Sequence, residues 1–396
     1  MHAQDIIQDL LDAECPQIHA KRRRCLAVMA EAARDGELTL LGMSRFLPQG
    51  TSIRHRIKRC DRLMSNEKLN DEILPIYAAM ARRVIAPSSQ PAIIVDWSDL
   101  RADQSRHLLR AALMVRGRAV VLYEEVHPGK DYGAAKVHRK FLRRLQCILP
   151  PMSRPVIITD AGFRAPWFKM VERIGWAWIG RIRNRDMVRP CGSEQPWLGC
   201  KSLYTKANKN PKDLGHFDYV RSNTVACRLV LIKKRPKGRH QKTLAGKRSR
   251  SRQSLKNAAG QIEPWLLAVS PQLASLNAAQ IVGLYGGRMQ IEQTFRDLKN
   301  PRWGLGLSHT QTRNPKRLAV LLLIGALAIY ALWLIGLAAR ASGYFIEYGS
   351  RKKAQNALSV ISLAQWWLRE ERSTRAIMRR RIRFALEELS MTVVYI

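Results

Sequence analysis

The sequence has few acidic side chains. Its 396 residues contain 31 Asp and Glu against 68 Lys and Arg, which gives a formal net charge of +37 at pH 7. Between Asp218 and Glu263 there is no carboxylate at all. A field of this sign attracts polyanions and repels a second copy of the chain unless something anionic neutralises it. The charge balance therefore predicts nucleic acid as the partner.

Cysteine is also scarce, and a signal for export is missing. The seven cysteines are an odd number without the close pairs of a zinc knuckle or a redox motif; they stand at positions 15, 25, 60, 147, 191, 200 and 227. This pattern argues against the disulfide framework of secreted proteins. The first residues, MHAQDIIQDLLDAE, are acidic and amphipathic where a signal peptide is basic and then apolar. We expect a reduced, cytoplasmic protein associated with the nucleoid.

Long apolar runs are rare, since a single stretch, residues 318–339, runs for 22 residues without a charge. By length it could span a membrane. Its many Ala and Gly residues, its solitary occurrence and the Arg-rich chain on both sides favour a buried core helix instead. With 46% hydrophobic residues and 25% charged ones, the chain is globular, large enough for two or three domains, and expected to have no membrane partner.

Residues 1–86 have the pattern of helices separated by short turns. The segment TSIRHRIKRCDRLMSN begins with Thr and Ser and carries apolar side chains at helical spacing, namely Ile53, Ile57, Cys60 and Met64. Its other faces are basic, with Arg54, Lys58, Arg59 and Arg62. Together with LTLLGMSRFLP before it, the segment is similar to a helix-turn-helix whose second helix enters a DNA groove. A solvated, Arg-rich helix is an equally good interpretation.

From residue 91 the pattern changes to short apolar strands. AIIVDW, HLLRAALMVRG and RAVVLYEEV predict three strands, the last two joined by a tight turn at residues 116–118. A helix (AAKVHRKFLRRLQCIL), a strand (PVIITD), a helix (APWFKMVERIG) and a strand (WAWIGRIR) follow. A right-handed crossover would place PVIITD parallel to AIIVDW. Both strands would then end in an aspartate, Asp96 and Asp160, at the same edge of an α/β sheet.

Residues 184–275 interrupt this order. HFDYV, TVACRLVLIKK and EPWLLAVS have the composition of strands, so the segment reads as a β-rich insertion. Residues 233–260, between the last two, have no hydrophobic period and no acid. We expect them to form a solvated polybasic loop that binds phosphates without sequence preference.

The next segment, AAQIVGLYGGRMQIEQTFRDLKN, predicts one helix over residues 278–300 that ends before Pro301. At 100° per residue, Tyr285, Arg288, Glu292 and Lys299 fall within about 60° of one another. A carboxylate flanked by cations can hold a metal while the cations bind phosphates around it. A surface pattern of i,i+4 charges has the same spacing, and for this helix alone it is the simpler interpretation.

Taken together, Asp96, Asp160 and Glu292 are more informative than each is alone. A single Asp at a strand end is usually a turn residue. Two such aspartates on adjacent strands and a glutamate on a helix that packs on the sheet would give three hard oxygen donors. Such a set suits two Mg²⁺ or Mn²⁺ ions per active site and phosphoryl transfer, in which one ion activates water or a 3′-hydroxyl and the other stabilises the leaving oxygen.

These residues also resemble a known family. Y-x2-R-x3-E-x6-K, formed by Tyr285, Arg288, Glu292 and Lys299, is similar to the YREK signature of bacterial DDE transposases of the insertion-sequence-four family. VDWSDLR, ITDAGF, WIGRIR and YGGRMQIEQTFRDLK together resemble its insertion-sequence-ten-like branch, and the resemblance runs from about residue 5 to 340. It implies an RNase H-like catalytic core with Asp96, Asp160 and Glu292 as its catalytic metal ligands.

The resemblance further implies a cut-and-paste transposase that cleaves transposon ends through DNA hairpins and joins 3′-hydroxyls to target DNA. Tyr285, Arg288 and Lys299 would contact DNA, and Trp265 would stack on a flipped base, although a buried strand tryptophan is as good an interpretation. Since two ends must be joined, we expect a DNA-bound dimer. The expected organisation is a helical DNA-binding domain (1–86), the core (87–183 and 276–340), the insertion (184–275) and a helical C-terminal region, a candidate for dimerisation (341–396).

Three other functions compete with this one. A structure-selective nuclease on the same fold would use the same carboxylates, because hydrolysis and transesterification differ only in whether water or a 3′-hydroxyl attacks. A tyrosine recombinase would use Tyr285 as nucleophile, but no cluster of Arg and His is placed to support it. A membrane-anchored polybasic protein would need residues 318–339 as its anchor.

Overall fold

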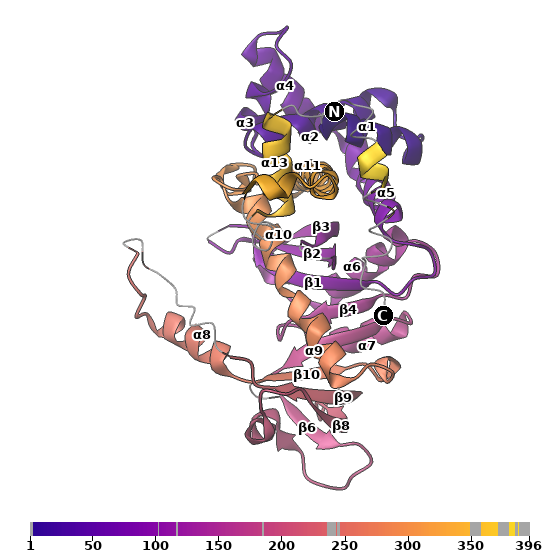
Figure 1. The fold of residues 1–396 in the computed structure, drawn as a ribbon, viewed down its shortest axis with the longest axis vertical. Helices are drawn as coiled ribbons and strands as arrows, with labels where there is room; N and C mark the ends of the chain where they lie inside the picture. The colour runs from indigo at the N-terminus through magenta and orange to yellow at the C-terminus, as the bar shows by residue number, and fades with distance from the viewer. Residues whose placement is uncertain are drawn as a thin grey trace. The chain divides into compact units, whose positions relative to one another are not determined.

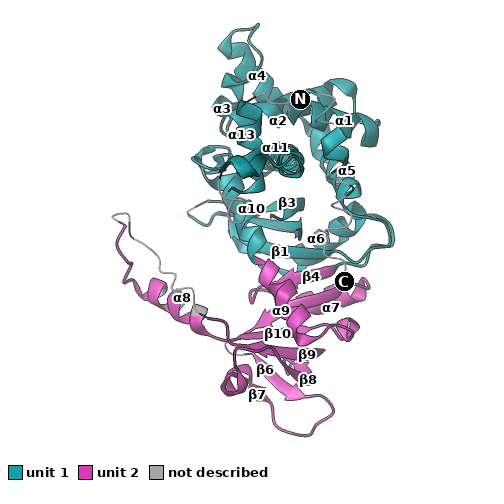
Figure 2. Cartoon of the chain, viewed as in Figure 1, with its two compact units in different colours: residues 1–155, 289–396 teal, residues 156–288 magenta. Residues whose placement is uncertain are grey.

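The chain forms two compact units (Figure 2). Unit 1 comprises residues 1–155 and 289–396, and unit 2 comprises residues 156–288. The computed structural model describes residues 3–101, 103–115, 118–183, 186–235, 243, 246–348, 358–370, 380–384 and 387. The units divide the chain at other points than the expected domains, whose limits stay a prediction.

Unit 1 contains the strands β1 to β3 and most of the helices (Figure 1). Its elements are α1 (Ala3–Glu14), α2 (Ala20–Asp35), α3 (Leu40–Arg45), α4 (Ile53–Met64), α5 (Glu67–Val84), β1 (Ala92–Asp99), β2 (Arg106–Leu113), β3 (Val120–Pro128), α6 (Ala135–Ile148), α10 (Met289–Lys299), α11 (Pro315–Ala341) and α13 (Val360–Arg369), with short 3-10 turns at Gly129–Asp131, Leu307–His309 and Tyr344–Tyr348. The helical pattern predicted for residues 1–86 is confirmed by α1 to α5.

The strands of unit 1 run in the order β3-β2-β1 and are antiparallel, as the sequence predicts. The tip of the β2–β3 turn, residues 116 and 117, lies outside the described residues. One expectation is wrong: Asp96 does not end its strand, because β1 continues to Asp99. The buried run stops at Val95, but Ser98 and Asp99 still pair with β2. Burial and strand pairing therefore end at different residues.

The long apolar helix α11 is the core of unit 1, which confirms the interpretation of residues 318–339 as a buried helix. It is long and apolar enough to cross a membrane, yet 94% of its most apolar 18-residue stretch is buried inside the protein. α1, α2, α5, α13 and β3 all contact it (Figure 2). The helix begins with Pro315 after Asn314, whose side-chain oxygen accepts hydrogen bonds from two backbone N–H groups of the first turn.

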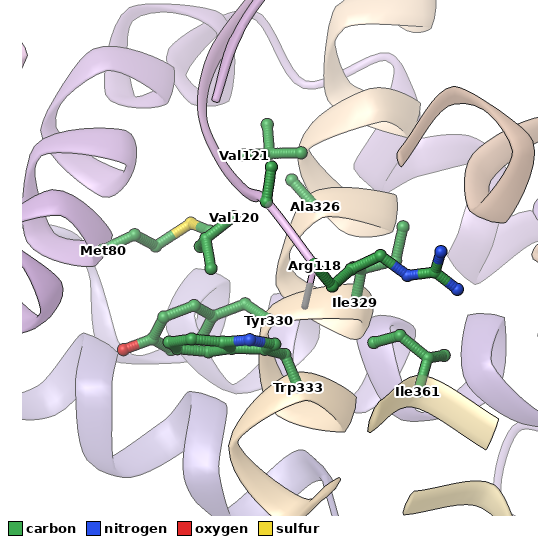
Figure 3. A pocket seen from close by; sticks show the side chains of 10 residues that line it. Met80, Arg118, Val120, Val121, Ala326, Ile329, Tyr330, Trp333 and Ile361 are labelled. Atoms are coloured by element: carbon green, nitrogen blue, oxygen red, sulfur yellow. The ribbon is translucent and has the colours of Figure 1, made fainter. Parts of the chain in front are cut away.

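A small cavity beside α11 shows how completely this core is filled (Figure 3). Its volume of about 10 Å³ is just enough for one water molecule. Met80, Val120, Trp333 and Ile361 are among the side chains that line it, and no carboxylate is. The cavity is a packing defect of the core, without the size or the chemistry of a substrate site.

Unit 2 is a mainly antiparallel sheet with helices. Its elements are β4 (Val156–Thr159), α7 (Ala165–Arg173), β5 (Ala177–Ile182), β6 (Met187–Pro190), β7 (Leu198–Gly199), β8 (Lys212–Tyr219), β9 (Val225–Ile232), α8 (Arg252–Ile262), β10 (Trp265–Val269) and α9 (Ala278–Gly287), with 3-10 turns at Cys200–Lys206 and Pro271–Leu273. Within the unit the strand order is β4-β5-β10-β9-β8-β6-β7, and β4 and β5 are parallel. The predicted succession of strand, helix and strand over PVIITD, APWFKMVERIG and WAWIGRIR is confirmed by β4, α7 and β5, and the three strands of the insertion by β8, β9 and β10. The parallel placement of PVIITD beside AIIVDW stays a prediction.

The polybasic segment of unit 2 is not a loop throughout, so that expectation is wrong for its second half. Residues 252–262 form α8, which Ser251 caps by accepting a hydrogen bond from the backbone N–H of Ser254. Residues 236–242, 244 and 245 lie outside the described part of the chain. A good N-cap and helix-forming residues such as Leu255 and Ala258 can form a helix without a long hydrophobic period.

The predicted single helix over residues 278–300 is also wrong in detail. Two helices occupy this stretch: α9 ends at Gly287, and α10 begins at Met289. Arg288 caps α9 with helical dihedral angles, and its N–H donates to the carbonyl of Tyr285. Two consecutive glycines, Gly286 and Gly287, disfavour helix by about 1 kcal/mol each relative to Ala. The shared face of Tyr285, Arg288, Glu292 and Lys299 was inferred for an unbroken helix, and it stays a prediction.

Candidate active site

The structure divides the residues of the predicted site between the two units. Asp96, Glu292 and Lys299 belong to unit 1. Unit 2 contains Asp160, directly after β4, and three of the residues predicted to contact DNA, Tyr285, Arg288 and Trp265. The convergence of the three carboxylates stays a prediction.

Asp96 lies in β1 directly opposite Arg110 of β2. Paired residues of antiparallel strands point to the same face of the sheet, so Asp96 and Arg110 share a face. Ser98 shares it too, because side chains alternate along a strand. One oxygen of Asp96, Oδ1, accepts a hydrogen bond of 2.8 Å from the backbone N–H of Trp97.

The helix that carries Glu292 covers this same face. The guanidinium of Arg110 donates through Nη1 to the hydroxyl of Thr294 at 2.9 Å and lies 4.9 Å from the ring centre of Phe295. Both residues belong to α10, which contacts β1. Glu292 precedes Thr294 by two positions and is exposed. Arg110 therefore holds the glutamate's helix against the face from which Asp96 projects.

Arg110 is itself fixed by a buried polar network that the sequence analysis missed. Its Nε and Nη2 donate to one carboxylate oxygen of Glu124 on β3, at 2.9 and 2.5 Å, and both side chains are almost fully buried. The other oxygen of Glu124 accepts a hydrogen bond of 3.2 Å from the hydroxyl of Tyr77 on α5. A buried ion pair is tolerated only when such hydrogen bonds satisfy it. The network joins α5, β2, β3 and α10.

A second arginine, Arg118, fastens α10 from the β2–β3 turn. It donates to the side-chain oxygen of Gln293 at 2.7 Å, and its Nε lies 3.0 Å from a carboxylate oxygen of Asp297. Burial raises the pKa of Asp297, an effect that the nearby arginines Arg118 and Arg110 partly offset. Gln293 and Asp297 are one turn apart, so Arg118 spans a single face of the helix.

Lys299 joins the end of α10 to the end of β1. Its Nζ donates to the hydroxyl of Ser98 at 2.7 Å and to the backbone carbonyl of Asp99. Burial, together with the positive charge of Arg110, lowers the pKa of Lys299 to about 8. Glu292 lies two turns before Lys299 on nearly the same side of α10. Unit 1 thus holds a strand carboxylate, a helix carboxylate and an ammonium group on adjoining elements.

The reverse face of β1 is supported by an aromatic cluster around Trp97. The indole Nε1 donates to Nε2 of His138 at 3.1 Å, and the rings of His127 and Tyr132 lie 5.6 and 5.1 Å from it. Burial, and after it the charge of His127, lowers the pKa of His138 to about 4. The imidazole is therefore neutral at pH 7 and can accept this hydrogen bond. The cluster fixes the strand on the side opposite to Asp96.

In unit 2, Asp160 follows the last residue of β4 directly, as the sequence predicts. Its Oδ1 accepts a hydrogen bond of 2.8 Å from the backbone N–H of Gly162, which closes a tight turn. A side chain at position 162 would come within 3.0 Å of the same oxygen, so glycine keeps this edge of the carboxylate accessible. Asp160 is half-exposed. Its surroundings therefore suit both a turn residue and a metal ligand.

The aromatic residues of unit 2 form a second group. Trp265, the first residue of β10, is half-buried, and its ring lies edge-on to Tyr285 with 5.0 Å between centres. Lys234 Nζ lies 4.3 Å from the centre of the Trp265 ring. Tyr285 is buried, and Arg288 lies 6.0 Å from its ring. Tyr285 supports Trp265 in this arrangement, and direct contact of either with DNA stays a prediction.

The donor chemistry of the three acids fits divalent ions, because carboxylate oxygens are the ligands that Mg²⁺ and Mn²⁺ prefer. Among the residues that the structure describes, no three His, Cys, Asp or Glu side chains lie close enough together to hold a metal ion. Unit 1 contributes two acids, Asp96 and Glu292, and the third, Asp160, is in unit 2. The number of ions and their identity stay predictions.

Comparison with known families decides the class of the protein. A model of the transposase DDE domain matches residues 87–329, which is more than half of the chain and includes all three acids. The chain belongs to the DDE transposases. It is therefore a metal-dependent enzyme that cleaves DNA and transfers strands. A search of the curated proteins finds no match to the chain.

Because the pKa of Lys299 is lowered, we expect end binding and strand transfer by this transposase to depend on pH. An ammonium with a pKa of about 8 is charged at pH 7 and loses its proton as the pH rises through 8. If Lys299 binds a phosphate, end binding and strand transfer should weaken over that range. Lys299→Arg should remove this alkaline loss, because a guanidinium stays charged. The pH profile of both activities, measured at constant ionic strength, checks this expectation.

The matched control is Lys316→Arg, the same exchange at an exposed residue in the first turn of α11. Its profile should follow that of the unmodified enzyme. An alkaline loss that persists unchanged in Lys299→Arg would show that another group titrates.

The basic helix near the N-terminus of the transposase is formed as predicted. α4 begins after Ser52, whose side chain accepts from the N–H of His55, and it packs against α3. The predicted DNA-contacting side chains are all exposed: Arg54, Lys58, Arg59 and Arg62. One detail is wrong, since Ile53, placed on the apolar face by its spacing, is 45% exposed. It lies in the first turn, where the helix has not yet reached the core of unit 1.

Proposed function

We propose that this DDE transposase is the cut-and-paste enzyme of an insertion sequence, of the insertion-sequence-four family and its insertion-sequence-ten-like branch. The observation that carries the proposal is that the domain match contains Asp96, Asp160 and Glu292 together with the YREK spacing around Glu292. Its substrates would be transposon-end DNA and target DNA, bound by a dimer in the cytoplasm on the nucleoid.

An RNase H-like core is the architecture that this proposal requires. The antiparallel order β3-β2-β1 in unit 1 and the parallel pair β4 and β5 in unit 2 support it. So does the position of Asp160 at a strand end and of Glu292 on a helix that packs on the sheet carrying Asp96. The insertion between the second Asp and the Glu is β-rich, as such a core would carry.

We infer that Asp96, Asp160 and Glu292 would hold two divalent ions. When bound, such ions generate a nucleophile from water or a 3′-hydroxyl and stabilise the leaving oxygen. The residues of the chain would do the rest. Lys299, hydrogen-bonded to Ser98 and Asp99, would hold a phosphate of the DNA, and the guanidinium of Arg288 would hold another.

The most informative experiment uses a duplex that carries the element's own terminal repeat. Incubation with the purified protein and Mg²⁺, followed by a denaturing gel, separates nicks, hairpins and strand-transfer products. All three are expected from a cut-and-paste transposase. Nicks alone, with no joined products at any target concentration, would favour the second candidate, a structure-selective nuclease on the same fold.

Recognition of the terminal repeat is assigned to the helix-turn-helix formed by α3 and α4. Its exposed cations, Arg54, Lys58, Arg59 and Arg62, would reach phosphates and base edges of one groove. The rest of the positive charge, including residues 233–260, would bind DNA without sequence preference and with an affinity that falls as the ionic strength rises.

Hairpin formation is assigned to Trp265. A tight hairpin requires unstacking of bases at the end, and stacking on an indole would offset about 1 to 3 kcal/mol of that cost. Trp265→Ala should therefore nick normally and accumulate nicked ends. An abasic site at the flipped position should partly restore hairpins. Quantified nick-to-hairpin ratios on a denaturing gel measure both effects.

The structure supplies a comparison for this prediction. Trp197 is also half-buried in unit 2, and the guanidinium of Arg189 lies 4.9 Å from its ring centre. The corresponding cation of Trp265 is Lys234, whose Nζ lies 4.3 Å from the ring centre. Wild-type ratios in Trp265→Ala would make Trp265 an ordinary packing residue. Nick accumulation in Trp197→Ala alone would move the role to Trp197.

A further inference from the structure

The segment after α10, residues 300–306, is a loop with a fixed shape. The side-chain oxygen of Asn300 accepts hydrogen bonds from the N–H groups of Arg302 at 2.8 Å and Trp303 at 2.9 Å. The backbone carbonyl of Asn300 accepts two more, from Gly304 at 3.0 Å and Gly306 at 3.1 Å. Four hydrogen bonds to one residue leave this loop little conformational freedom.

The loop is fastened to its surroundings on two sides. The N–H of Leu305 donates to the carbonyl of Asp297 in α10, at 2.7 Å, and its own carbonyl accepts from the N–H of Leu38, just before α3, at 2.6 Å. At Gly304 a side chain would come within 2.1 Å of the Asp297 carbonyl, so only glycine fits. The loop therefore connects the helix of Glu292 with the start of the α3–α4 pair.

This rigid loop holds a tryptophan in solvent. Trp303 is 68% exposed, the highest value among the ten tryptophans of the chain, and the guanidinium of Arg302 lies 4.9 Å from its ring centre. A large apolar ring in water contributes little to folding. The arrangement instead offers an aromatic face beside a cation, the combination that proteins use to bind nucleobases and their phosphates.

We propose that Trp303 stacks on the terminal base of a cleaved transposon end, with Arg302 binding a phosphate of the same strand. The proposal rests on the proposed function. Inside a duplex both faces of a base are covered by its neighbours, so only the last base of a broken end offers a free face. Trp303 follows Lys299 by four residues, and Lys299 is bonded to Ser98, two residues beyond Asp96. The stacked base would therefore lie next to the reacting phosphate.

The first experiment compares binding of a pre-cut end and of the uncut duplex, both carrying the element's terminal repeat. Trp303→Ala should weaken binding of the cut end by about 5- to 150-fold, the range for loss of one base-aromatic stack, and leave the uncut duplex unaffected. Trp303→Phe should restore most of the loss. Equal weakening for both duplexes, or weakening of neither, overturns the proposal.

The matched control is Trp366→Ala. Trp366 lies on α13 and is 43% exposed, and Arg369 lies 5.3 Å from its ring, so it is a second exposed tryptophan beside an arginine in the same unit. It should bind both duplexes as the unmodified enzyme does. The salt dependence separates the two partners: Arg302→Ala should reduce the slope of log affinity against log salt by about one, and Trp303→Ala should leave it unchanged.

A second experiment needs no substitution at Trp303. Glu292→Gln is bound to a cut end with 5-iododeoxyuridine as its terminal base and irradiated. Trypsin cuts after Arg302 and Arg313, so the adduct should lie on the peptide of residues 303–313. An adduct on the peptide that contains Trp265 overturns the proposal. Absence of any cleavage by the unmodified enzyme in Mg²⁺ would instead count against the proposed function, with the adduct still readable.

Discussion

Asp96→Ala, Asp160→Ala and Glu292→Ala are each expected to abolish DNA cleavage and joining while end binding is largely retained. Each change removes a proposed metal ligand and no phosphate contact. A bound ion stabilises the charge that develops in the transition state by several kcal/mol. A loss of about 4 kcal/mol of this stabilisation lowers the rate about a thousandfold. Single-turnover nicking in Mg²⁺ and a gel-shift measurement of end binding check the two parts.

Asp103→Ala is the matched control for Asp96, since it removes an exposed carboxylate from the β1–β2 turn of the same sheet. It should nick at the normal rate. Substantial nicking by any of the three acid variants would take that residue out of the site. Loss of end binding as well as cleavage would indicate a folding defect, which thermal unfolding would reveal.

Arg110→Met is expected to affect stability and catalysis together. It leaves Glu124 buried without its partner, which costs about 3 to 5 kcal/mol of unfolding free energy. It also removes the hydrogen bond to Thr294, so α10 can shift against β1, and a displacement of about 1 Å at a reacting group costs about a hundredfold in rate. Chemical denaturation and nicking rates measure the two losses.

Two further variants separate these effects. Arg110→Met combined with Glu124→Leu and Tyr77→Phe removes the whole polar network, so most of the stability should return while nicking stays low. Thr294→Val keeps the Arg110–Glu124 ion pair and removes the hydrogen bond from Arg110 to α10. This variant should lose about 1 to 3 kcal/mol of unfolding free energy and should also nick slowly. Recovery of normal nicking in the triple variant would contradict a positioning role for Arg110.

The strands were predictable because each is a short apolar run between turn residues, and burial alone reveals such runs. The end of β1 was not, since it depends on the pairing of Ser98 and Asp99 with β2. The break between α9 and α10 at Arg288 could not be predicted from local sequence either. Gly286 and Gly287 weaken the helix, yet where it divides depends on contacts that no local pattern contains.

The candidate acids could be named from sequence because two of them follow apolar strand runs and the third lies in the Y-x2-R-x3-E-x6-K spacing. Arg110 could not be assigned, although a signal was present: it is the one charged residue within an otherwise apolar stretch, HLLRAALMV. A buried arginine needs an acid, and Glu124 lies on the next strand. Which acid faces it depends on the register, because adjacent residues Glu124 and Glu125 point to opposite faces.

The position of α11 in the chain sets the order in which the enzyme can fold during synthesis. Unit 2, residues 156–288, is continuous and complete before residue 315 is made. α1, α2 and α5 bury their apolar faces against α11, which ends at Ala341. At about 5 to 20 residues per second, the first 155 residues emerge about 10 to 40 s before this partner. Residues 1–155, which include Asp96, therefore reach their final packing after unit 2 can fold, although they are translated first.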